Sequence, residues 1–300
     1  LTEYFAPVLG VMRVDTLQEA IDAVNAVDYG LTSGLHTLDS EELDMWLDGI
    51  EAGNLYVNRG ITGAIVRRQP FGGWKRSAIG STTKAGGPSY LLGLGEVEPA
   101  HNASTEAETT QALLALAPGV LALFEATEAQ LSARERTELR RALNADAQAW
   151  ASAYGANRDV TGLACERNIL RYRPTPVLLR AGRATPLVDV VRVLAAGILA
   201  GGPIGLSVAE ALPQSLLDAV EAAGVEVSVE DADAWDARLA MVATSGGLGM
   251  RVRVLGPHDE SSQERWAHAS RVTGGSPDLA LYTGAVTPCP HSELLPFVRE

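Results

Sequence analysis

Apolar residues in the first 97 positions recur at the spacings of short strands and amphipathic helices. Residues 8–14 alternate loosely between apolar and small or polar positions, which predicts a strand. Thr16 follows as a helix N-cap, and Glu19 stands three residues later, which is the spacing of a capping box. The apolar positions of this first helix recur at helical spacing: Leu17, Ala20, Ile21 and Val24.

A second amphipathic helix is predicted over residues 40–50, with Ser40 as its N-cap. Its apolar stripe comprises Leu43, Trp46, Leu47 and Ile50. Gly53 ends the helical pattern. The alternation of residues 54–58 (NLYVN) predicts a strand directly after it.

From about residue 168 the pattern alternates between strands and helices. The strand-like runs are 169–179, 204–208, 225–229, 250–255 and 279–282, and the helical patterns cover 187–199 and 216–223. Such alternation favours a parallel, doubly wound sheet. The sequence therefore predicts the α/β class, with a Rossmann-like domain in the second half.

Residues 98–111 (EPAHNASTEAETTQ) are small and polar, which predicts a linker between residues 1–97 and 112–300. The second part begins with an alanine-rich helical stretch that runs to about residue 153. Three leucines can share one face of it: Leu131, Leu139 and Leu143. The chain begins at Leu1 rather than Met and ends at Glu300 without a tail, and we expect it to be a fragment.

Composition excludes several classes of function. The chain has 300 residues, 46% of them hydrophobic and 20% charged, and a net charge of −13, which disfavours nucleic-acid binding. Residues 188–204, the most apolar run, contain Asp189 and Arg192, so we expect a core helix and no transmembrane segment. Cys165 and Cys289 have no CxxC partner, which indicates a reducing, cytoplasmic location.

Four short segments of residues 1–97 carry a stronger signal together than alone. They are residues 3–8 (EYFAPV), 25–34 with Asn25 before YGLTSG, 53–59 (GNLYVNR) and 69–77 (QPFGGWKRS). In order and spacing they resemble the aldehyde dehydrogenase superfamily, although Ala6 stands where that family has glycine. The resemblance implies NAD as cofactor, with Glu3 accepting the ribose hydroxyls and Phe5 packing on the nicotinamide ring. Taken alone, Glu3 would read as a surface residue and Phe5 as a core residue.

Residues 60–71 (GITGAIVRRQPF) indicate the subfamily. They resemble the loop of L-glutamate γ-semialdehyde (1-pyrroline-5-carboxylate) dehydrogenases. The resemblance implies that the amides of Gly63 and Ala64 hold the substrate α-carboxylate and that Phe71 flanks its aliphatic part. Successive N–H groups in a glycine-containing loop can cradle an anion. The alternative is a plain glycine-rich turn with Phe71 in the core.

Residues 84–91, 168–174 and 293–300 resemble the bifunctional proline-utilisation enzymes that carry an extra C-terminal domain. In that family the extra domain resembles a Rossmann fold, is non-catalytic and supports assembly, which implies a homo-oligomer. A dinucleotide site needs G-x-G-x-x-G between a strand and a helix. Residues 181–186 contain one glycine, and the glycines of 246–249 precede a strand, so a second NAD site is disfavoured.

No catalytic residue of the family is expected within this chain. The resemblance implies a nucleophilic cysteine, an oxyanion asparagine and a general base upstream of Glu3, so we expect the isolated chain to be inactive. FAD is expected only if a proline dehydrogenase domain is fused upstream. Cys289 and His291 could form a dyad, or be two ordinary loop residues. The five histidines lack the spacing of metal ligands.

The implied activity of the parent protein is NAD-dependent oxidation of L-glutamate γ-semialdehyde to L-glutamate in proline catabolism. Two alternatives stay open. One is a non-catalytic assembly or oligomerisation module derived from an aldehyde dehydrogenase. The other is a different aldehyde dehydrogenase subfamily, against which the Gly63–Ala64 loop argues.

Overall fold

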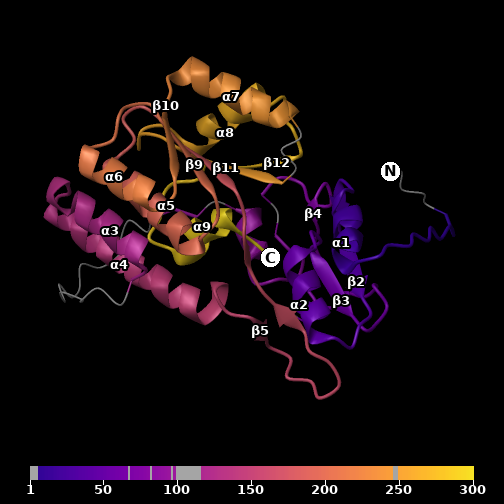
Figure 1. Cartoon of the computed structure of the whole chain (residues 1–300). Helices are drawn as coiled ribbons and strands as arrows, with labels where there is room; N and C mark the ends of the chain where they lie inside the picture. The colour runs from indigo at the N-terminus through magenta and orange to yellow at the C-terminus, as the bar shows by residue number, and fades with distance from the viewer. Residues whose placement is uncertain (1–5, 67, 82, 96, 99–115, 246–248) are drawn as a thin grey trace. The chain divides into compact units, whose positions relative to one another are not determined.

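The computed structural model describes residues 6–66, 68–81, 83–95, 97–98, 116–245 and 249–300 (Figure 1). The chain forms two compact units. The first comprises residues 1–78 and 84–87, and the second comprises residues 79–83 and 88–300. Most of the linker that we expected at 98–111 lies outside the described residues, so the boundary at residue 97 stays a prediction.

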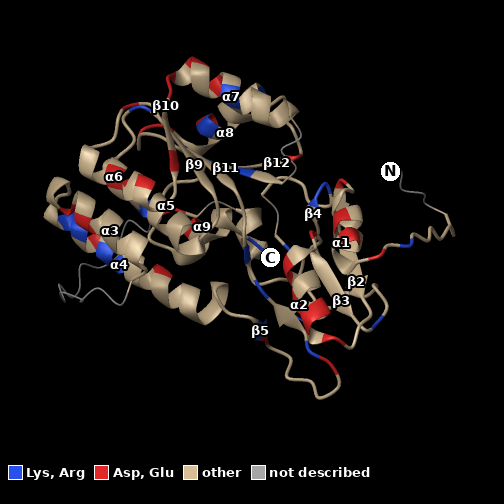
Figure 2. Cartoon of the chain, in the orientation of Figure 1, with Lys and Arg blue, Asp and Glu red and all other residues tan. Residues whose placement is uncertain are grey.

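The first unit packs two helices beside short strand pairs. Its elements are α1 (Leu17–Asn25), β1 (Tyr29–Gly30), β2 (Thr32–Leu35), α2 (Ser40–Gly49), β3 (Asn54–Val57) and β4 (Trp74–Lys75). Strand β2 pairs in parallel with β3, and β1 pairs antiparallel with β4. Ile21, Trp46 and Ile50 form the buried centre, which confirms the predicted apolar faces of both helices except at Val24, which is 48% exposed. Acidic residues lie along both helices (Figure 2). Each helix has acidic residues in its first turn, where the helix dipole favours a negative charge.

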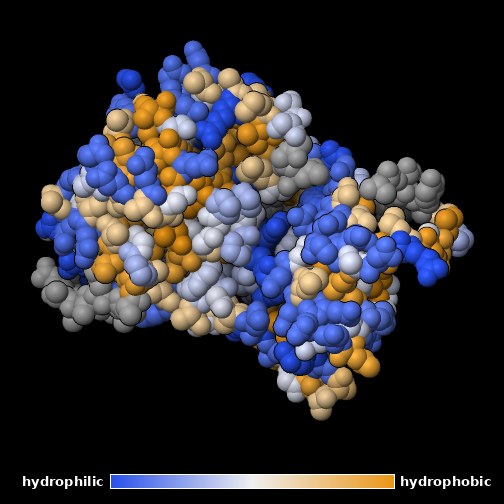
Figure 3. All heavy atoms as spheres, viewed as in Figure 1, coloured by the Kyte–Doolittle hydropathy of each residue, from blue (hydrophilic) through white to orange (hydrophobic). Residues whose placement is uncertain are grey.

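Three local predictions for this unit need correction. Residues 8–14 form no strand, because no described strand pairs with them; Leu9 is 87% exposed. Apolar atoms of this N-terminal part are visible on the surface (Figure 3).

The second helix is capped by Asp39 rather than Ser40, since the Asp39 carboxylate accepts the Glu41 N–H at 2.8 Å. Thr16 caps α1 as predicted, but the Glu19 carboxylate accepts from Asp15 rather than from Thr16.

The second unit contains the predicted doubly wound parallel sheet. Its strand order is β10-β9-β8-β11-β12. These strands are β8 (Val177–Ala181), β9 (Ile204–Val208), β10 (Glu226–Val229), β11 (Met250–Leu255) and β12 (Leu279–Tyr282). All neighbours pair in parallel. The α/β class is therefore confirmed.

Helices cover both faces of this sheet (Figure 1). One cluster joins β8 and β9 to α5 (Leu187–Ala200), α6 (Gln214–Ala222), α3 (Pro118–Thr127) and α4 (Ala133–Ala149). Leu131, Leu139 and Leu143 are buried in this cluster, as predicted. The opposite cluster joins Leu178 and Val252 to α7 (Ala232–Thr244) and α8 (Ser262–Val272). No helix in the described part of the chain is long and apolar enough to cross a membrane.

Prolines divide the run predicted as one strand over residues 169–179. The structure has β6 (Ile169–Leu170), β7 (Arg173–Pro174) and β8 there, because Pro174 and Pro176 lack the N–H that a continuous ladder needs. Strand β6 pairs with β5 (Arg158–Asp159).

The sequence pattern did not predict helices α7 and α8. Asp231 caps α7 by accepting the Ala234 N–H at 2.9 Å.

The C-terminal segment is held by arginines that reach it from the sheet and helices. It contains α9 (Pro290–Leu294), a 3₁₀ turn and β13 (Val298–Arg299), which pairs with β7. Four arginines donate to its carbonyl groups: Arg192 to Thr287, Arg253 to Tyr282 and Gly284, Arg265 to Thr283, and Arg251 to Leu295 and Val298. Four of these carbonyls lie outside the strands, namely those of Thr283, Gly284, Thr287 and Leu295, and the arginines supply hydrogen bonds that a strand ladder would otherwise give.

Arg192 also forms a buried ion pair with Asp146 of α4. Two guanidinium nitrogens lie 2.5 and 2.9 Å from the two carboxylate oxygens. The pair joins α4 to α5, and both side chains are almost fully buried. Removal of one partner from such a pair leaves an uncompensated buried group, and this costs more than the pair itself contributes.

We expect Arg192→Met to lower the free energy of unfolding of the second unit by about 3–5 kcal/mol. Hydrogen exchange of the β8 and β9 amides measures this unit directly. Arg134→Met is the matched control, because Arg134 pairs with Glu138 at the exposed surface, and its loss should cost less than about 1 kcal/mol. Equal effects of the two variants would contradict a structural role for the buried pair.

Burial raises the pKa of Asp146 from 3.8 to about 6, against the opposing charge of Arg192. Between these two values the folded state binds more protons at Asp146 than the unfolded state does. The contribution of Asp146 to stability therefore falls as pH rises through this window. We expect Asp146→Asn to remove that part of the pH dependence of unfolding of the second unit. An unchanged slope in the variant would refute this prediction.

Candidate substrate-anchoring loop

One side chain of β3 holds the C-terminal end of the loop formed by residues 60–71 beside the strand that leads into the loop. The Asn54 amide donates to the Pro70 carbonyl at 2.9 Å, and its oxygen accepts the Gly72 N–H at 3.0 Å. Since Asn54 lies just before the loop and Pro70 near its end, these two bonds close the loop at its base. The anchor loop, as we call residues 60–71, is thereby held to the strand pair β2–β3.

Lys84 adds a buried positive charge to the base of the anchor loop. Its side chain is 7% exposed. The ammonium donates to the carbonyls of Gly53 and Gly72 at 2.6 and 2.7 Å, and to Asn54 Oδ1 at 3.2 Å. Lys84 therefore has a structural role at the base of the anchor loop.

Phe71, a predicted substrate contact, is positioned through its backbone. Its N–H donates to the Ala85 carbonyl at 3.0 Å, and the Ala85 N–H donates back at 2.9 Å. This reciprocal pair fixes the direction of the Phe71 side chain, which stays half-buried. The ring is therefore neither fully enclosed in the core nor free on a mobile loop.

The tip of the anchor loop presents Gly63 and Ala64 at the surface. Ile65 and Gln69 form an isolated antiparallel bridge just beyond them. Gly63 has φ +110°, a conformation that side-chain-bearing residues rarely adopt. Among the described residues, neither the Gly63 N–H nor the Ala64 N–H has a hydrogen-bond acceptor. Two adjacent exposed amides are what a carboxylate cradle requires.

Two asparagines of the remaining motifs hold backbone segments together. The Asn25 side chain donates to the Gly49 carbonyl at 2.8 Å and accepts the Glu51 N–H at 2.9 Å. Asn58 makes the same two-way contact with the backbone of Thr37. The structure thus separates this structural pair from Gly63 and Ala64. Glu3 and Phe5, the predicted cofactor contacts, lie outside the described residues.

In the second unit, the carboxyl edge of the sheet carries acidic groups where a Rossmann domain binds pyrophosphate. The β8–α5 turn contains Gly182, and α5 begins after Pro186 with Asp189 in its first turn. Asp189 accepts from His258 Nε2 at 3.0 Å, and burial raises the pKa of Asp189. A carboxylate there repels an anion. This electrostatic arrangement agrees with the expectation of no second NAD site.

The Cys289–His291 dyad gains no support from the geometry. His291 Nδ1 is 2.7 Å from the Tyr154 hydroxyl, and burial raises the pKa of Tyr154. His291 Nδ1 therefore contacts Tyr154, and no hydrogen bond between Cys289 and His291 is present among the described residues. Cys165 is exposed. The described residues contain no group of three His, Cys, Asp or Glu that could hold a metal ion.

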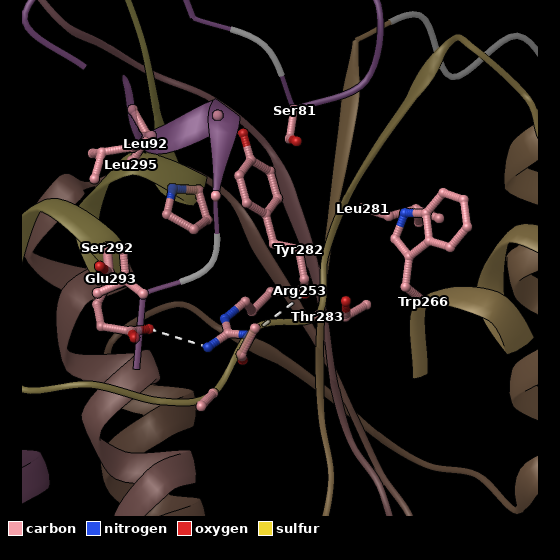
Figure 4. A pocket seen from close by; sticks show the side chains of 16 residues that line it. Ser81, Leu92, Arg253, Trp266, Leu281, Tyr282, Thr283, Ser292, Glu293 and Leu295 are labelled. Atoms are coloured by element: carbon pink, nitrogen blue, oxygen red, sulfur yellow. Dashed lines mark hydrogen bonds and ion pairs between the residues drawn. The ribbon is translucent and has the colours of Figure 1, made fainter. Parts of the chain in front are cut away.

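A pocket of about 240 Å³ lies in the second unit beside the end of β12 (Figure 4). Arg253 and Glu293 line it, with Arg253 Nη2 3.4 Å from Glu293 Oε2. Glu293 also accepts the Thr287 N–H at 2.9 Å. The charges of Arg253 and Glu293 compensate each other, and both side chains already bond to other protein groups. We therefore assign the pocket no ligand.

Comparison with known proteins places these features in context. Residues 1–94 match the aldehyde dehydrogenase family. The chain is 35% identical over 230 residues to the bifunctional protein PutA of Rhizobium meliloti, a match that covers 75% of this chain and 17% of that protein. It is 44% identical over 90 residues to 1-pyrroline-5-carboxylate dehydrogenase of Staphylococcus aureus (strain JH1), covering 30% of this chain and 17% of that protein.

A solved structure extends the similarity along nearly the whole chain. Proline utilization A (PutA) from Corynebacterium freiburgense matches with a TM-score of 0.65 and 30% identity, over 98% of this chain and 25% of that one. The chain therefore spans about a sixth of the curated relatives' length (17%) and a quarter of this structure's. The similarity to PutA covers both units.

We expect Lys84→Met to loosen the base of the anchor loop, because three acceptors lose their donor, at about 1–3 kcal/mol for a buried unsatisfied group. Hydrogen exchange of the Phe71 and Gly72 amides should accelerate more than tenfold, while that of the β8 amides stays unchanged. Arg76→Met, which removes an exposed pair with Asp28, is the control and should change neither. Unaltered exchange at Phe71 in Lys84→Met would show that Lys84 does not hold the loop.

Proposed function

Because residues 1–94 belong to the aldehyde dehydrogenase family, we propose that this chain is part of a longer NAD-dependent enzyme. The enzyme oxidises L-glutamate γ-semialdehyde to L-glutamate in proline catabolism. Partial coverage of longer relatives supports the view that these residues work within a longer polypeptide. The names of the relatives, a bifunctional PutA and a 1-pyrroline-5-carboxylate dehydrogenase, support the substrate class.

The observation that carries the proposal is the pair of adjacent amides at Gly63 and Ala64. Both are exposed, and neither has an acceptor among the described residues. A substrate α-carboxylate would accept hydrogen bonds from both, and the half-buried Phe71 would flank its aliphatic chain. Charge-assisted bonds of this kind select an aldehyde that carries a carboxylate.

The chemistry would be completed by groups that the family resemblance places before Glu3. NAD, when bound, accepts the hydride. Glu3 and Phe5 are our proposed contacts for its ribose and nicotinamide, and FAD would be needed only with a fused proline dehydrogenase domain. Within this chain the residues of the anchor loop bind and orient the substrate. Because the thiolate nucleophile is not among them, the 300-residue chain alone should have no dehydrogenase activity.

A second candidate function is a non-catalytic assembly module. The well-packed second unit supports it, because its carboxyl edge is acidic and its C-terminal segment is fixed by arginines. In the enzyme proposal the same unit assists assembly of a homo-oligomer, so the two proposals differ in whether the first unit serves a reaction.

The test compares two aldehydes on the enzyme extended to include the complete aldehyde dehydrogenase segment. We expect kcat/KM for L-glutamate γ-semialdehyde to exceed that for butanal by at least about 100-fold, since two charge-assisted hydrogen bonds contribute roughly 1.5–3 kcal/mol each. The 300-residue chain alone, assayed in parallel, should reduce no NAD. A preference for butanal would reject the substrate class, and no turnover by the extended enzyme would favour the assembly module.

A further inference from the structure

Tyr56 contacts the anchor loop at the peptide that would bind the substrate. Its side chain is 5% exposed and lies on β3, two residues after Asn54 and therefore on the same side of the strand. The Tyr56 hydroxyl donates to the Gly63 carbonyl at 2.6 Å, a short hydrogen bond. One face of β3 thus fixes the base of the loop through Asn54 and its tip through Tyr56.

This hydrogen bond also fixes the direction of the next amide. The Gly63 carbonyl and the Ala64 N–H belong to the same peptide group, which is planar and trans. In a trans peptide the C=O and N–H bonds point in opposite directions. Since the carbonyl points to the Tyr56 hydroxyl, the Ala64 N–H points away from it. Ala64 is exposed, so this N–H is accessible to a ligand.

A positive charge lies next to the same peptide. The guanidinium of Arg59 stacks over the Tyr56 ring, with its carbon 5.5 Å from the ring centre. A Cβ atom built on Gly63 would be 3.6 Å from Arg59 Nη2, so the charged group is close to the Gly63 backbone. The cation raises the electrostatic potential where the carboxylate would lie. Geometry and charge therefore favour an anion at the same point.

We propose that Tyr56 is a positioning residue for the carboxylate end of the substrate. By holding the Gly63 carbonyl, it sets the Ala64 N–H in the direction that receives the carboxylate, and it makes the enzyme selective for aldehydes that carry this group. This role rests on the proposed function of the anchor loop. Tyr56 touches neither the aldehyde carbon nor the cofactor, and it acts through the Gly63–Ala64 peptide.

The competing explanation is that Tyr56 only fills the core of the first unit. A core role would make any loss of the hydroxyl affect all substrates alike. A positioning role affects only substrates with a carboxylate, because butanal does not use the Ala64 N–H. The two roles therefore differ in their substrate dependence.

Tyr56→Phe in the extended enzyme tests this difference, since it removes the hydroxyl and keeps the ring. We expect kcat/KM for L-glutamate γ-semialdehyde to fall about 10- to 100-fold, mainly through a higher KM, as for loss of a hydrogen bond that orients a charged group. The kcat/KM for butanal should stay within about twofold. Tyr29→Phe is the matched control, because Tyr29 is a half-exposed tyrosine of the same unit, and it should change neither value.

Four outcomes are decisive. Equal losses with both aldehydes, or no loss with either, would overturn the positioning role. If the unmodified enzyme itself fails to prefer the semialdehyde, the proposed function fails as well, which separates the two conclusions. Amide NMR of the unmodified chain provides a measurement that needs no variant: added L-glutamate should shift the Ala64 N–H signal more than that of Gly60. No shift at Ala64 would also overturn the inference.

Discussion

The buried Lys84 ammonium is the constraint on which the geometry of the first unit depends. It joins the carbonyls of Gly53 and Gly72 and the side chain of Asn54, so three segments far apart in sequence meet at one charge. A buried ammonium needs such acceptors, because its charge has lost the hydration that water would give it. The anchor loop emerges from this fixed base. Its exposed tip can therefore keep a defined shape although it makes few contacts of its own.

The two units differ in how their structures are stabilised. The second unit has a doubly wound sheet, two apolar clusters and arginines that hold its C-terminal segment. The carboxyl edge of its sheet has Asp189 in the first turn of α5. At this place a dinucleotide-binding domain uses the backbone N–H groups of the helix N-terminus to bind the pyrophosphate. The first unit is small, and among the described residues its amides at Gly63 and Ala64 have no hydrogen-bond acceptor. This contrast supports an accessory role for the second unit.

The sequence predicted the elements whose signal is local. Strands β9, β11 and β12 have the predicted bounds, because each is a short apolar run bounded by turn residues. The prediction was wrong for residues 8–14, because a strand needs a partner strand as well as an alternating pattern. These residues alternate like a strand but pair with no described strand. Motif resemblance singled out Gly63 and Ala64 as substrate contacts, which stays a prediction, and it assigned no role to Asn25, which ties backbone segments together. The role of Tyr56 was not predicted, since it depends on a contact with Gly63 across seven residues.

The central claim is that the anchor loop receives a carboxylate. A crystal structure of the extended enzyme with the product L-glutamate tests this most directly. The account predicts the α-carboxylate oxygens at about 2.7–3.2 Å from the backbone nitrogens of Gly63 and Ala64, with the Tyr56 hydroxyl still bonded to the Gly63 carbonyl. L-glutamate bound with its α-carboxylate on other groups, and those two amides left in water, would contradict it.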